Sequence, residues 1–443
     1  MVVVFVLVAI AVIALLAGVH RYVWSRLVRD TTAGRGRARR IGTVVMWVLP
    51  LLSLGALMSG RAGAPLWLES VLAWPGYLWL AVLLYLVLAL LVGEVVRAVW
   101  LRRGTSSPAE PAVAAPEPSL HTVPAGPAET PAPESGAGAS NGPVVETPAP
   151  PSGASADEPG EPDAPAQRQV SRRLFVSRVV GGGAAAAALA TVGHGTYGVL
   201  RGPRVTRVTV PLAKLPRSAH GFRIAVVSDI HLGPILGRAH TQRIVDTINR
   251  TSPDLVAVVG DLVDGSVADL GPAAEPLAQL KARHGSFFVT GNHEYFSGAG
   301  EWVDHVRELG LRPLENQRVE IAGFDLAGVN DVAGESEGDG PDFAKALGDR
   351  DRTRASVLLA HQPVVIHDAV EHGVDLQLSG HTHGGQLWPG NYLAELANPT
   401  VAGLERYGDT QLYVTRGAGA WGPPVRVGAP SDITVVQLAS RQA

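Results

Sequence analysis

Five short clusters of histidine, aspartate and asparagine stand in the C-terminal half of the chain, each directly after an apolar run. Carboxylate, amide and imidazole groups are the ligands preferred by divalent ions of intermediate hardness such as Mn²⁺, Fe²⁺ or Zn²⁺. The chain has no cysteine, which excludes thiolate metal sites, cysteine nucleophiles and disulfides. The clusters are Asp229-Ile230-His231, Gly260-Asp261-Leu262-Val263-Asp264, Gly291-Asn292-His293-Glu294, His361 and Gly380-His381-Thr382-His383.

The spacing inside two of these clusters predicts that pairs of side chains face one site. In the D-x-H pattern at Asp229 and the H-x-H pattern at His381, alternate residues of an extended segment point to the same side. The neighbouring glycines let the backbone approach an ion or a phosphate closely. The remaining histidines of this half match no such pattern, and we expect them at the surface. They are His240, His284, His305, His367 and His372.

The elements that must position the clusters are strands of an α/β domain. Apolar runs of strand length end in the clusters: FRIAVVSD, DLVAVVGD, GSFFVTGN, ASVLLAHQ and VDLQLSGH. Helix-like stretches such as HTQRIVDTINR and AGEWVDHVRELG alternate with them. Because the carboxyl ends of strands in one sheet meet at one edge, the sequence predicts that residues 204–443 form an α/β domain with one shared site.

The ordered series D-x-H, G-D-x-x-D, G-N-H-E, H and G-H-x-H resembles the calcineurin-like metallophosphoesterase superfamily, over residues 222–436. The whole layout is similar to the membrane-anchored bacterial branch of YkuE-type phosphoesterases. The resemblance implies a four-layer α-β-β-α sandwich. It also implies hydrolysis of phosphoester or pyrophosphate bonds by a hydroxide that bridges two divalent metal ions (Mn, Fe or Zn).

The resemblance also assigns a role to each matching residue. The implied ligands of the first ion are Asp229, His231, Asp261 and His383. The implied ligands of the second ion are Asp261 as the bridge, Asn292, His361 and His381. His293 is implied to lie over the phosphate as general acid or transition-state stabiliser, and Glu294 to orient it. Asp264 is either a capping carboxylate or a partner of a ligand. Asn330 stands where the branch often has an aspartate, which weakens the case for a direct role of the Asn330-Asp331 loop.

The first part of the chain, residues 1–103, is predicted to be a membrane domain of three helices. Uncharged runs over 2–19, 41–60 and 71–93 are each about long enough to cross a bilayer. Arginines crowd the loop between the first two runs and the segment after the third, so the positive-inside rule places residue 1 outside the cytoplasm. These runs hold no ionisable residue, which favours an anchor over an ion pathway. The alternative for the first run is a cleavable signal peptide, although it lacks a basic n-region.

Two further segments precede the α/β domain. Residues 104–170 are rich in Pro, Ala, Gly, Ser and Glu with almost no large apolar residues, which predicts a disordered linker. Residues 171–203 begin with SRRLFV, which resembles a twin-arginine export signal, and continue with a mildly apolar run that is either a fourth membrane helix or a cleaved signal. Its GGGAAAAALA stretch lacks the ending of a phosphate-binding loop. We therefore expect a multi-pass protein of the cell membrane with an extracytoplasmic catalytic domain.

Composition limits the partners. The net charge of −3 says little about partners, but the sequence shows nothing like a basic nucleic-acid-binding surface, so no nucleic-acid partner is expected. The expected partners are the membrane and a phosphoester substrate. Trp388, Tyr392 and Trp421 near the motifs favour an envelope or lipid-linked phosphate, with core packing as the alternative. The competing function is a metal-binding scaffold or sensor at the membrane that has lost turnover, and the complete ligand series argues against it.

Overall fold

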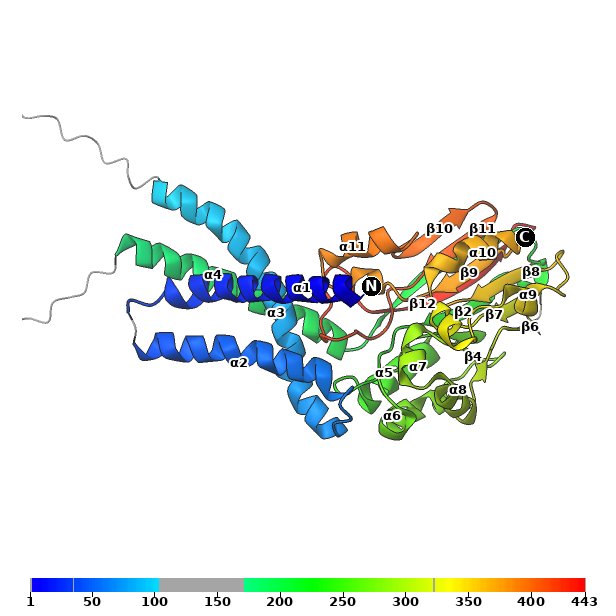
Figure 1. Ribbon diagram of the computed structural model, residues 1–443. Helices are drawn as coiled ribbons and strands as arrows, with labels where there is room; N and C mark the ends of the chain where they lie inside the picture. The colour runs from blue at the N-terminus through cyan, green and yellow to red at the C-terminus, as the bar shows by residue number, and fades with distance from the viewer. Residues whose placement is uncertain (1, 35, 103–170, 322, 443) are drawn as a thin grey trace, which may run out of the picture.

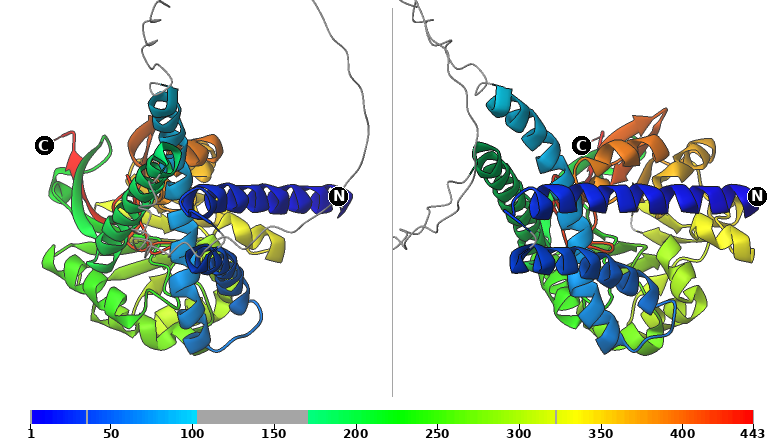
Figure 2. Two further views of the ribbon diagram at one scale, coloured as in Figure 1. Left: turned by 90° about the vertical axis from the view of Figure 1, so that its left-hand side faces the viewer. Right: turned by 60° about the vertical axis from the view of Figure 1, so that its left-hand side comes forward.

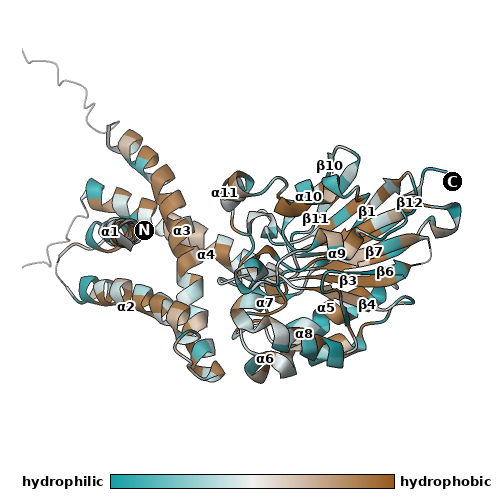
Figure 3. Ribbon diagram, turned by 45° about the vertical axis from the view of Figure 1, so that its right-hand side comes forward, coloured by the Kyte–Doolittle hydropathy of each residue, from teal (hydrophilic) through white to brown (hydrophobic). Residues whose placement is uncertain are grey.

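The computed structural model describes residues 2–34, 36–102, 171–321 and 323–442 (Figure 1). The linker predicted at 104–170 lies outside the described residues. The described chain consists of long apolar helices at one end and an α/β domain at the other, and Figure 3 shows the contrast in hydropathy between them.

Among the described residues, four helices are long and apolar enough to cross a membrane. Successive helices run in opposite directions, so the start of the first and the end of the last lie on the side of the α/β domain (Figures 1 and 2). The first continues as a π-helical turn at Ser25–Arg29. The helices are α1 (Val2–Trp24), α2 (Arg37–Ser59), α3 (Leu66–Arg102) and α4 (Arg172–Leu200).

Helix α3 is longer than the apolar run that predicted it. Beyond residue 93 it carries Glu94 and Arg97 against the π-helical turn that follows α1. The Glu94 carboxylate lies 2.5 Å from Arg26 Nε, and Asp30 lies 2.8 Å from Arg26 Nη1 and 3.6 Å from Arg97 Nη1. Charges at the end of an apolar helix are stabilised when they pair with one another. The ion pairs therefore join the arginine-rich ends of α1 and α3.

The α/β domain contains two six-stranded sheets. In the first, β1 pairs in parallel with β12, β12 is antiparallel to β2, and β2 to β5 are parallel. Its strands in spatial order are β1 (Arg204–Leu212), β12 (Asp432–Ser440), β2 (Arg223–Val227), β3 (Leu255–Val259), β4 (Ser286–Val289) and β5 (Arg312–Pro313).

The second sheet has a parallel centre with an antiparallel strand at each edge. Its strands in spatial order are β10 (Gly403–Tyr407), β11 (Thr410–Val414), β9 (Leu376–Ser379), β8 (Ala355–Leu359), β7 (Phe324–Gly328) and β6 (Gln317–Ile321). The five strands that the sequence predicted are β2, β3, β4, β8 and β9, and each lies within its apolar run.

The two sheets pack face to face over a core that includes Ile224, Phe287 and Phe324. A second core, with Trp302, lies between the first sheet and its helices, and a third, with Ile366, covers the second sheet. These layers confirm the α-β-β-α sandwich. The helices are α5 (Arg238–Arg250), α6 (Val267–Ala274), α7 (Asn292–Ser297), α8 (Ala299–Glu308), α9 (Phe343–Leu347), α10 (Ile366–Glu371) and α11 (Gly390–Ala397).

One histidine expected at the surface is buried instead. His240, in α5, is 1% exposed, and neither ring nitrogen has a hydrogen-bond partner among the described residues. The helix turns this position inward together with Ile244, four residues later, because residues i and i+4 share a helix face. The surface prediction for His240 is therefore wrong.

The apolar helices pack directly on the domain. Tyr85 Oη of α3 donates a hydrogen bond of 2.9 Å to the carbonyl of Trp388, and Ser70 Oγ donates one of 2.8 Å to the carbonyl of Pro234. On α4, Gly195 lies so close to the domain that a β-carbon there would be 2.7 Å from Val425 Cγ1. Glycine at this position is what allows the two backbones to meet.

Candidate metal centre

The predicted site residues come together at one edge of the sandwich. They lie on the loops that directly follow β2, β3, β4, β8 and β9. Backbone hydrogen bonds tie neighbouring loops together: the Asp229 N–H donates to Gly260 O at 3.1 Å, and the His231 N–H donates to Asp261 O at 3.2 Å. The strands of both sheets therefore deliver the side chains to a common centre.

Five of the seven predicted metal ligands adopt a left-handed backbone. Their φ angles lie between 49° and 72°, at Asp229, His231, Asp261, His381 and His383. The prediction that D-x-H and H-x-H are simply extended is therefore wrong. Non-glycine residues in this region are strained and persist only where the surroundings enforce them.

Around Asp229, the left-handed backbone is held in place by close packing against Gly417. A β-carbon at Gly417 would be 2.5 Å from Asp229 Cβ, so only glycine fits at this approach.

The first group of side chains consists of Asp229, His231 and His383, whose ligand atoms lie within 4.8 Å of one another. His231 Nε2 is 3.0 Å from His383 Nε2, and His383 Nε2 is 3.3 Å from Asp229 Oδ1. All three residues are buried. Two ring nitrogens and a carboxylate oxygen thus converge on one point.

The second group consists of Asp261, His361 and His381, again within 4.8 Å. His361 Nε2 is 3.1 Å from Asp261 Oδ2, and His381 Nδ1 is 3.0 Å from Asn292 Oδ1. The Asp261 carboxylate also lies 3.8 Å from His231 Nε2 of the first group. Asp261 thus stands between the two groups.

Two of these rings are oriented by a fixed hydrogen bond at Nδ1. His361 Nδ1 donates to Val259 O at 2.9 Å, and His231 Nδ1 donates to Asp264 Oδ1 at 3.0 Å. Each bond leaves the lone pair of Nε2 pointing into the site, which is the tautomer that a metal ligand requires.

These contacts fit a bound cation. The buried His361 Nε2 has no hydrogen-bond partner among the described residues and faces the Asp261 carboxylate. A lone pair and a carboxylate buried together need a positive charge between them, either a proton or a metal ion. Without an ion the proton fills this place: burial lowers the pKa of His361, but Asp261, together with Asp229 and Asp331, outweighs burial and holds that pKa well above its usual value. The donor set of imidazole, carboxylate and amide groups suits Mn²⁺, Fe²⁺ or Zn²⁺.

His293 lies at the open side of the groups. Its Nδ1 is 2.7 Å from Asp264 Oδ1, the same oxygen that holds His231. Its ring meets those of Phe296 and Trp421 edge to face, with centroids 5.5 and 5.7 Å away. His293 is therefore fixed by one carboxylate and flanked by two exposed aromatic side chains.

Glu294 does not take the place expected of it. Its carboxylate accepts hydrogen bonds from the backbone N–H groups of Asp261 at 3.0 Å, Leu262 at 2.7 Å and Gly291 at 2.6 Å. Among the described residues, Asp264 and not Glu294 contacts the His293 ring. The longer side chain lets Glu294 clamp the β3 and β4 loops, so we replace its catalytic role with a structural one.

Arg426 is a site residue that the sequence analysis missed. Its buried guanidinium donates to His383 Nδ1 at 3.0 Å, to His383 O at 2.9 Å and to Gly419 O at 2.9 Å. Burial, and then Arg426, lower the pKa of His383 well below its usual value, which keeps that ring neutral. Nothing in the residue types near Arg426 signals this contact, which joins positions far apart in the sequence.

The Asn330-Asp331 loop lies beside the site without joining either group. Asn330 Nδ2 donates to Asp339 Oδ1 at 2.8 Å, and Asp331 Oδ1 accepts from Gln362 Nε2 at 2.9 Å. Gln362 directly follows His361, so Asp331 acts on the site through a neighbour of a predicted ligand.

Comparison with known proteins decides the family. Residues 222–385 match the family described as calcineurin-like phosphoesterase. The chain is also 38% identical over 256 residues to an uncharacterized metallophosphoesterase of Helicobacter pylori strain J99, which covers 56% of this chain and 68% of that protein. The chain belongs to the calcineurin-like phosphoesterase family. The two groups of side chains described above lie in this phosphoesterase domain.

Two further relatives match the chain. A zebrafish (Danio rerio) protein named "Transmembrane protein with metallophosphoesterase domain" is 40% identical over 259 residues, covering 55% of this chain and 59% of the relative. The metallophosphoesterase YkuE of Bacillus subtilis is 29% identical over 292 residues, covering 62% of this chain and 99% of YkuE. The chain thus spans about three fifths of the zebrafish relative's length. The four apolar helices of the described residues, together with the zebrafish relative, indicate that this member of the phosphoesterase family is a membrane protein.

Proposed function

We propose that the protein is a membrane-anchored hydrolase of phosphoester or pyrophosphate bonds that uses two divalent metal ions. The observation that carries the proposal is the position of Asp261, whose Oδ2 lies 3.1 Å from His361 Nε2 and 3.8 Å from His231 Nε2. One carboxylate facing the ligand atoms of two separate groups is what a pair of neighbouring ions requires.

The residues divide between the two ions as follows. Asp229, His231 and His383 would hold one ion, Asn292, His361 and His381 the other, and Asp261 both. When bound, such an ion pair lowers the pKa of a water molecule and stabilises the charge that develops on the phosphate. The structure supports the proposal through the fixed tautomers of His231 and His361.

His293 is placed to handle the proton of the leaving group. Its Nδ1 is held by Asp264, so its Nε2 is the ring atom available to a substrate. A histidine in this arrangement can donate a proton to the departing oxygen, a role that contributes about 10²–10⁴-fold to rate. The Asp264 carboxylate then serves two functions, since it fixes the metal-facing His231 and the substrate-facing His293 through one oxygen.

The experiment that tests this function is hydrolysis of bis-p-nitrophenyl phosphate by the full chain in lipid nanodiscs, with and without Mn²⁺. We expect metal-dependent release of p-nitrophenol that is lost after chelation and restored by adding metal. Asp342→Asn, which changes a carboxylate that caps α9, should behave like the native protein. A metal-loaded native protein that releases no p-nitrophenol would support the scaffold alternative.

We further propose that the phosphoesterase domain lies outside the cytoplasm and that Arg172 and Arg173 belong to an export signal. The alternation of α1 to α4 supports this side, because it puts the domain opposite the arginine-rich loop between α1 and α2. The chain has no cysteine, so Val370→Cys in α10 supplies a unique thiol. In intact cells it should react with a membrane-impermeant maleimide, and Arg172→Lys with Arg173→Lys should prevent the reaction. Labelling only after lysis would place the native domain in the cytoplasm.

A further inference from the structure

Helix α11 presents an apolar face that no other part of the described structure covers. Tyr392, Leu393 and Leu396 are 59%, 71% and 84% exposed, and the preceding Trp388 is 50% exposed. Tyr392 and Leu396, four residues apart, share one helix face, and Leu393 lies about 100° further round, so the three side chains cover one broad side of α11. A soluble surface rarely gathers large apolar side chains at such exposure.

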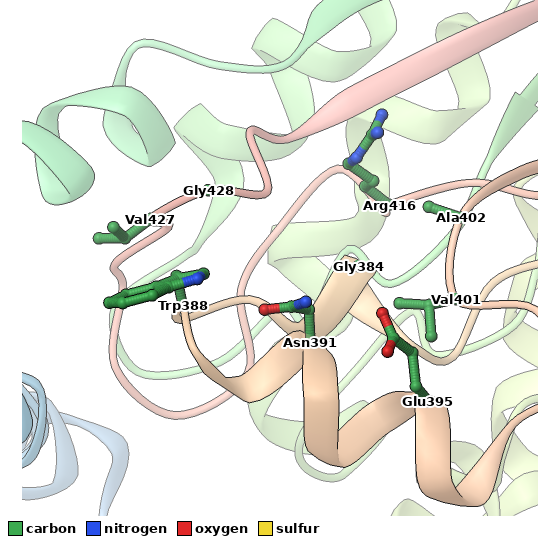
Figure 4. Close-up of a pocket in the computed structure, with 9 residues that line it drawn as sticks. All are labelled: Gly384, Trp388, Asn391, Glu395, Val401, Ala402, Arg416, Val427 and Gly428. Atoms are coloured by element: carbon green, nitrogen blue, oxygen red, sulfur yellow. The ribbon is translucent and has the colours of Figure 1, made fainter.

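The other face of α11 is polar. Asn391 and Glu395, four residues apart, line a cavity of about 320 Å³ that also contains Arg416 and Trp388 (Figure 4). Helix α11 is therefore amphipathic, with its polar side facing this cavity and its apolar side away from it. This orientation is the reverse of that expected for a helix covering a core, and it is the pattern of helices that lie in a membrane surface.

The contacts of the preceding loop place α11 at the depth of the membrane. The carbonyl of Trp388 accepts its hydrogen bond from Tyr85, within the apolar helix α3. Leu387 and Val427 pack into the same apolar cluster as Trp79 and Leu86 of α3. The loop that leads into α11 is thus continuous with the packing of the membrane helices.

The length of α3 gives an estimate of how deep Tyr85 lies in the bilayer. Its arginine-rich end is marked by Trp100, whose carbonyl accepts from Arg172 of α4 at 3.1 Å. Tyr85 precedes Trp100 by fifteen residues, which at about 1.5 Å per residue is at most about 22 Å along the helix. The hydrocarbon core of a bilayer is about 30 Å thick. Tyr85 and the Trp388 carbonyl therefore lie below the far surface of the bilayer.

The apolar face is also close to the metal centre. A β-carbon at Gly385 would be 2.3 Å from Asn391 Cα, so the first turn of α11 rests directly on the loop that carries His383. Gln386 Nε2 donates to the carbonyl of Trp421 at 2.9 Å, and Trp421 contacts His293. If α11 lies at the membrane, the metal centre therefore lies close to the membrane as well.

From these contacts we propose that the apolar face of α11, formed by Tyr392, Leu393 and Leu396 with Trp388, is inserted among the lipids of the bilayer that α1–α4 span. The substrate class that follows is a phosphoester carried on a lipid of that leaflet, presented to the metal centre without leaving the membrane. This substrate class rests on the proposed hydrolase function, whereas the insertion of α11 does not.

The insertion is tested in the full chain, in nanodiscs of phosphatidylethanolamine and phosphatidylglycerol. Because the chain has no cysteine, Leu393→Cys, Leu396→Cys and the control Val370→Cys each carry one spin label. Val370 is an exposed apolar residue of α10, one of the helices that cover the second sheet. At positions 393 and 396 we expect collisions with oxygen to exceed those with a water-soluble nickel complex several-fold, and the reverse at 370.

Two results would overturn the insertion. Nickel collisions that dominate at 393 and 396 would mean that the face is in water. Exclusion of both reagents would mean that protein covers it, as in a dimer formed through α11.

The substrate class is tested with two p-nitrophenyl phosphodiesters that share the bond to be cleaved. One carries a hexadecyl chain and is embedded in the nanodisc, and the other carries a methyl group and is dissolved. The double variant Leu393→Asp with Leu396→Asp should lower the ratio of hexadecyl to methyl ester cleavage at least tenfold, while Val370→Asp leaves it within twofold. An unchanged ratio refutes the lipid substrate. If the native protein cleaves neither ester, the hydrolase function fails, and the spin-label result still decides the insertion.

Discussion

Asp264→Asn tests whether one carboxylate oxygen supports both the metal centre and the catalytic histidine. Asp264 Oδ1 lies 3.0 Å from His231 Nδ1 and 2.7 Å from His293 Nδ1. The two rings hold the pKa of Asp264 down at about 2 even though burial opposes them, so the group is a carboxylate at neutral pH. The substitution keeps the shape of the side chain and removes its charge.

The size of the effect follows from the two hydrogen bonds. A hydrogen bond to a charged group contributes about 1.5–3 kcal/mol, and each 1.4 kcal/mol is a factor of about ten. Loss of the carboxylate behind His231 should weaken metal binding about 10–100-fold, the usual range for a partner of a metal ligand. Loss of the carboxylate behind His293 should lower kcat at saturating metal by a further factor of about 10–100.

The assay is a Mn²⁺ titration of the full chain in nanodiscs, followed by calorimetry and by p-nitrophenol release at each metal concentration. Asp342→Asn is the matched control, since Asp342 Oδ1 caps α9 and asparagine caps helices equally well. Metal affinity and kcat that both stay within twofold of the native values in Asp264→Asn would refute the reasoning. A fall in kcat alone would show that Asp264 acts on His293 and not on His231.

Three further variants test separate parts of the account. His293→Asn should keep its metal by elemental analysis but lose about 10²–10⁴-fold in kcat, with a smaller loss for esters of acidic phenols, which need little protonation on leaving. Burial, then Arg243 and Arg426, lower the pKa of His240 to about 3. The folded protein therefore keeps this ring neutral, and its stability, which is full above pH 6.5, falls as the unfolded chain takes up the proton, by about 2 kcal/mol at pH 5. Between pH 7 and 5 the thermal midpoint of His240→Leu should therefore fall less than that of the native protein. Gly195→Val should destabilise the chain by about 1–3 kcal/mol through overpacking against the domain, whereas Gly198→Val, with no atom within 4 Å of its β-carbon, should not; equal thermal midpoints would mean that α4 does not pack there.

The strands and the site residues were predictable because their signals are local. Each apolar run of strand length ends in residues of a motif, so FRIAVVSD marks both β2 and Asp229. The helix lengths were less predictable. Helix α3 extends beyond its apolar run because Glu94 pairs with Arg26, and that contact depends on where α1 ends. The burial of His240 likewise depends on which face of α5 meets the sheet.

The remaining differences come from contacts between distant segments. Arg426 reaches His383 from a loop after β11, and no local pattern distinguishes it from a surface arginine. The choice between Asp264 and Glu294 as the partner of His293 depends on ångström-scale placement of two adjacent loops. The left-handed backbone at His231 is imposed by packing, which the D-x-H spacing alone does not express.

The number of metal ions bound by the native chain and by Asp261→Asn tests the central claim most directly. After loading with Mn²⁺ and removal of free metal, elemental analysis should find about two ions per native chain, because Asp261 faces both groups of ligands. The variant should retain markedly fewer, since both coordination shells lose a charged oxygen. A native chain that binds a single ion, or a variant that binds as many ions as the native chain, would contradict the account.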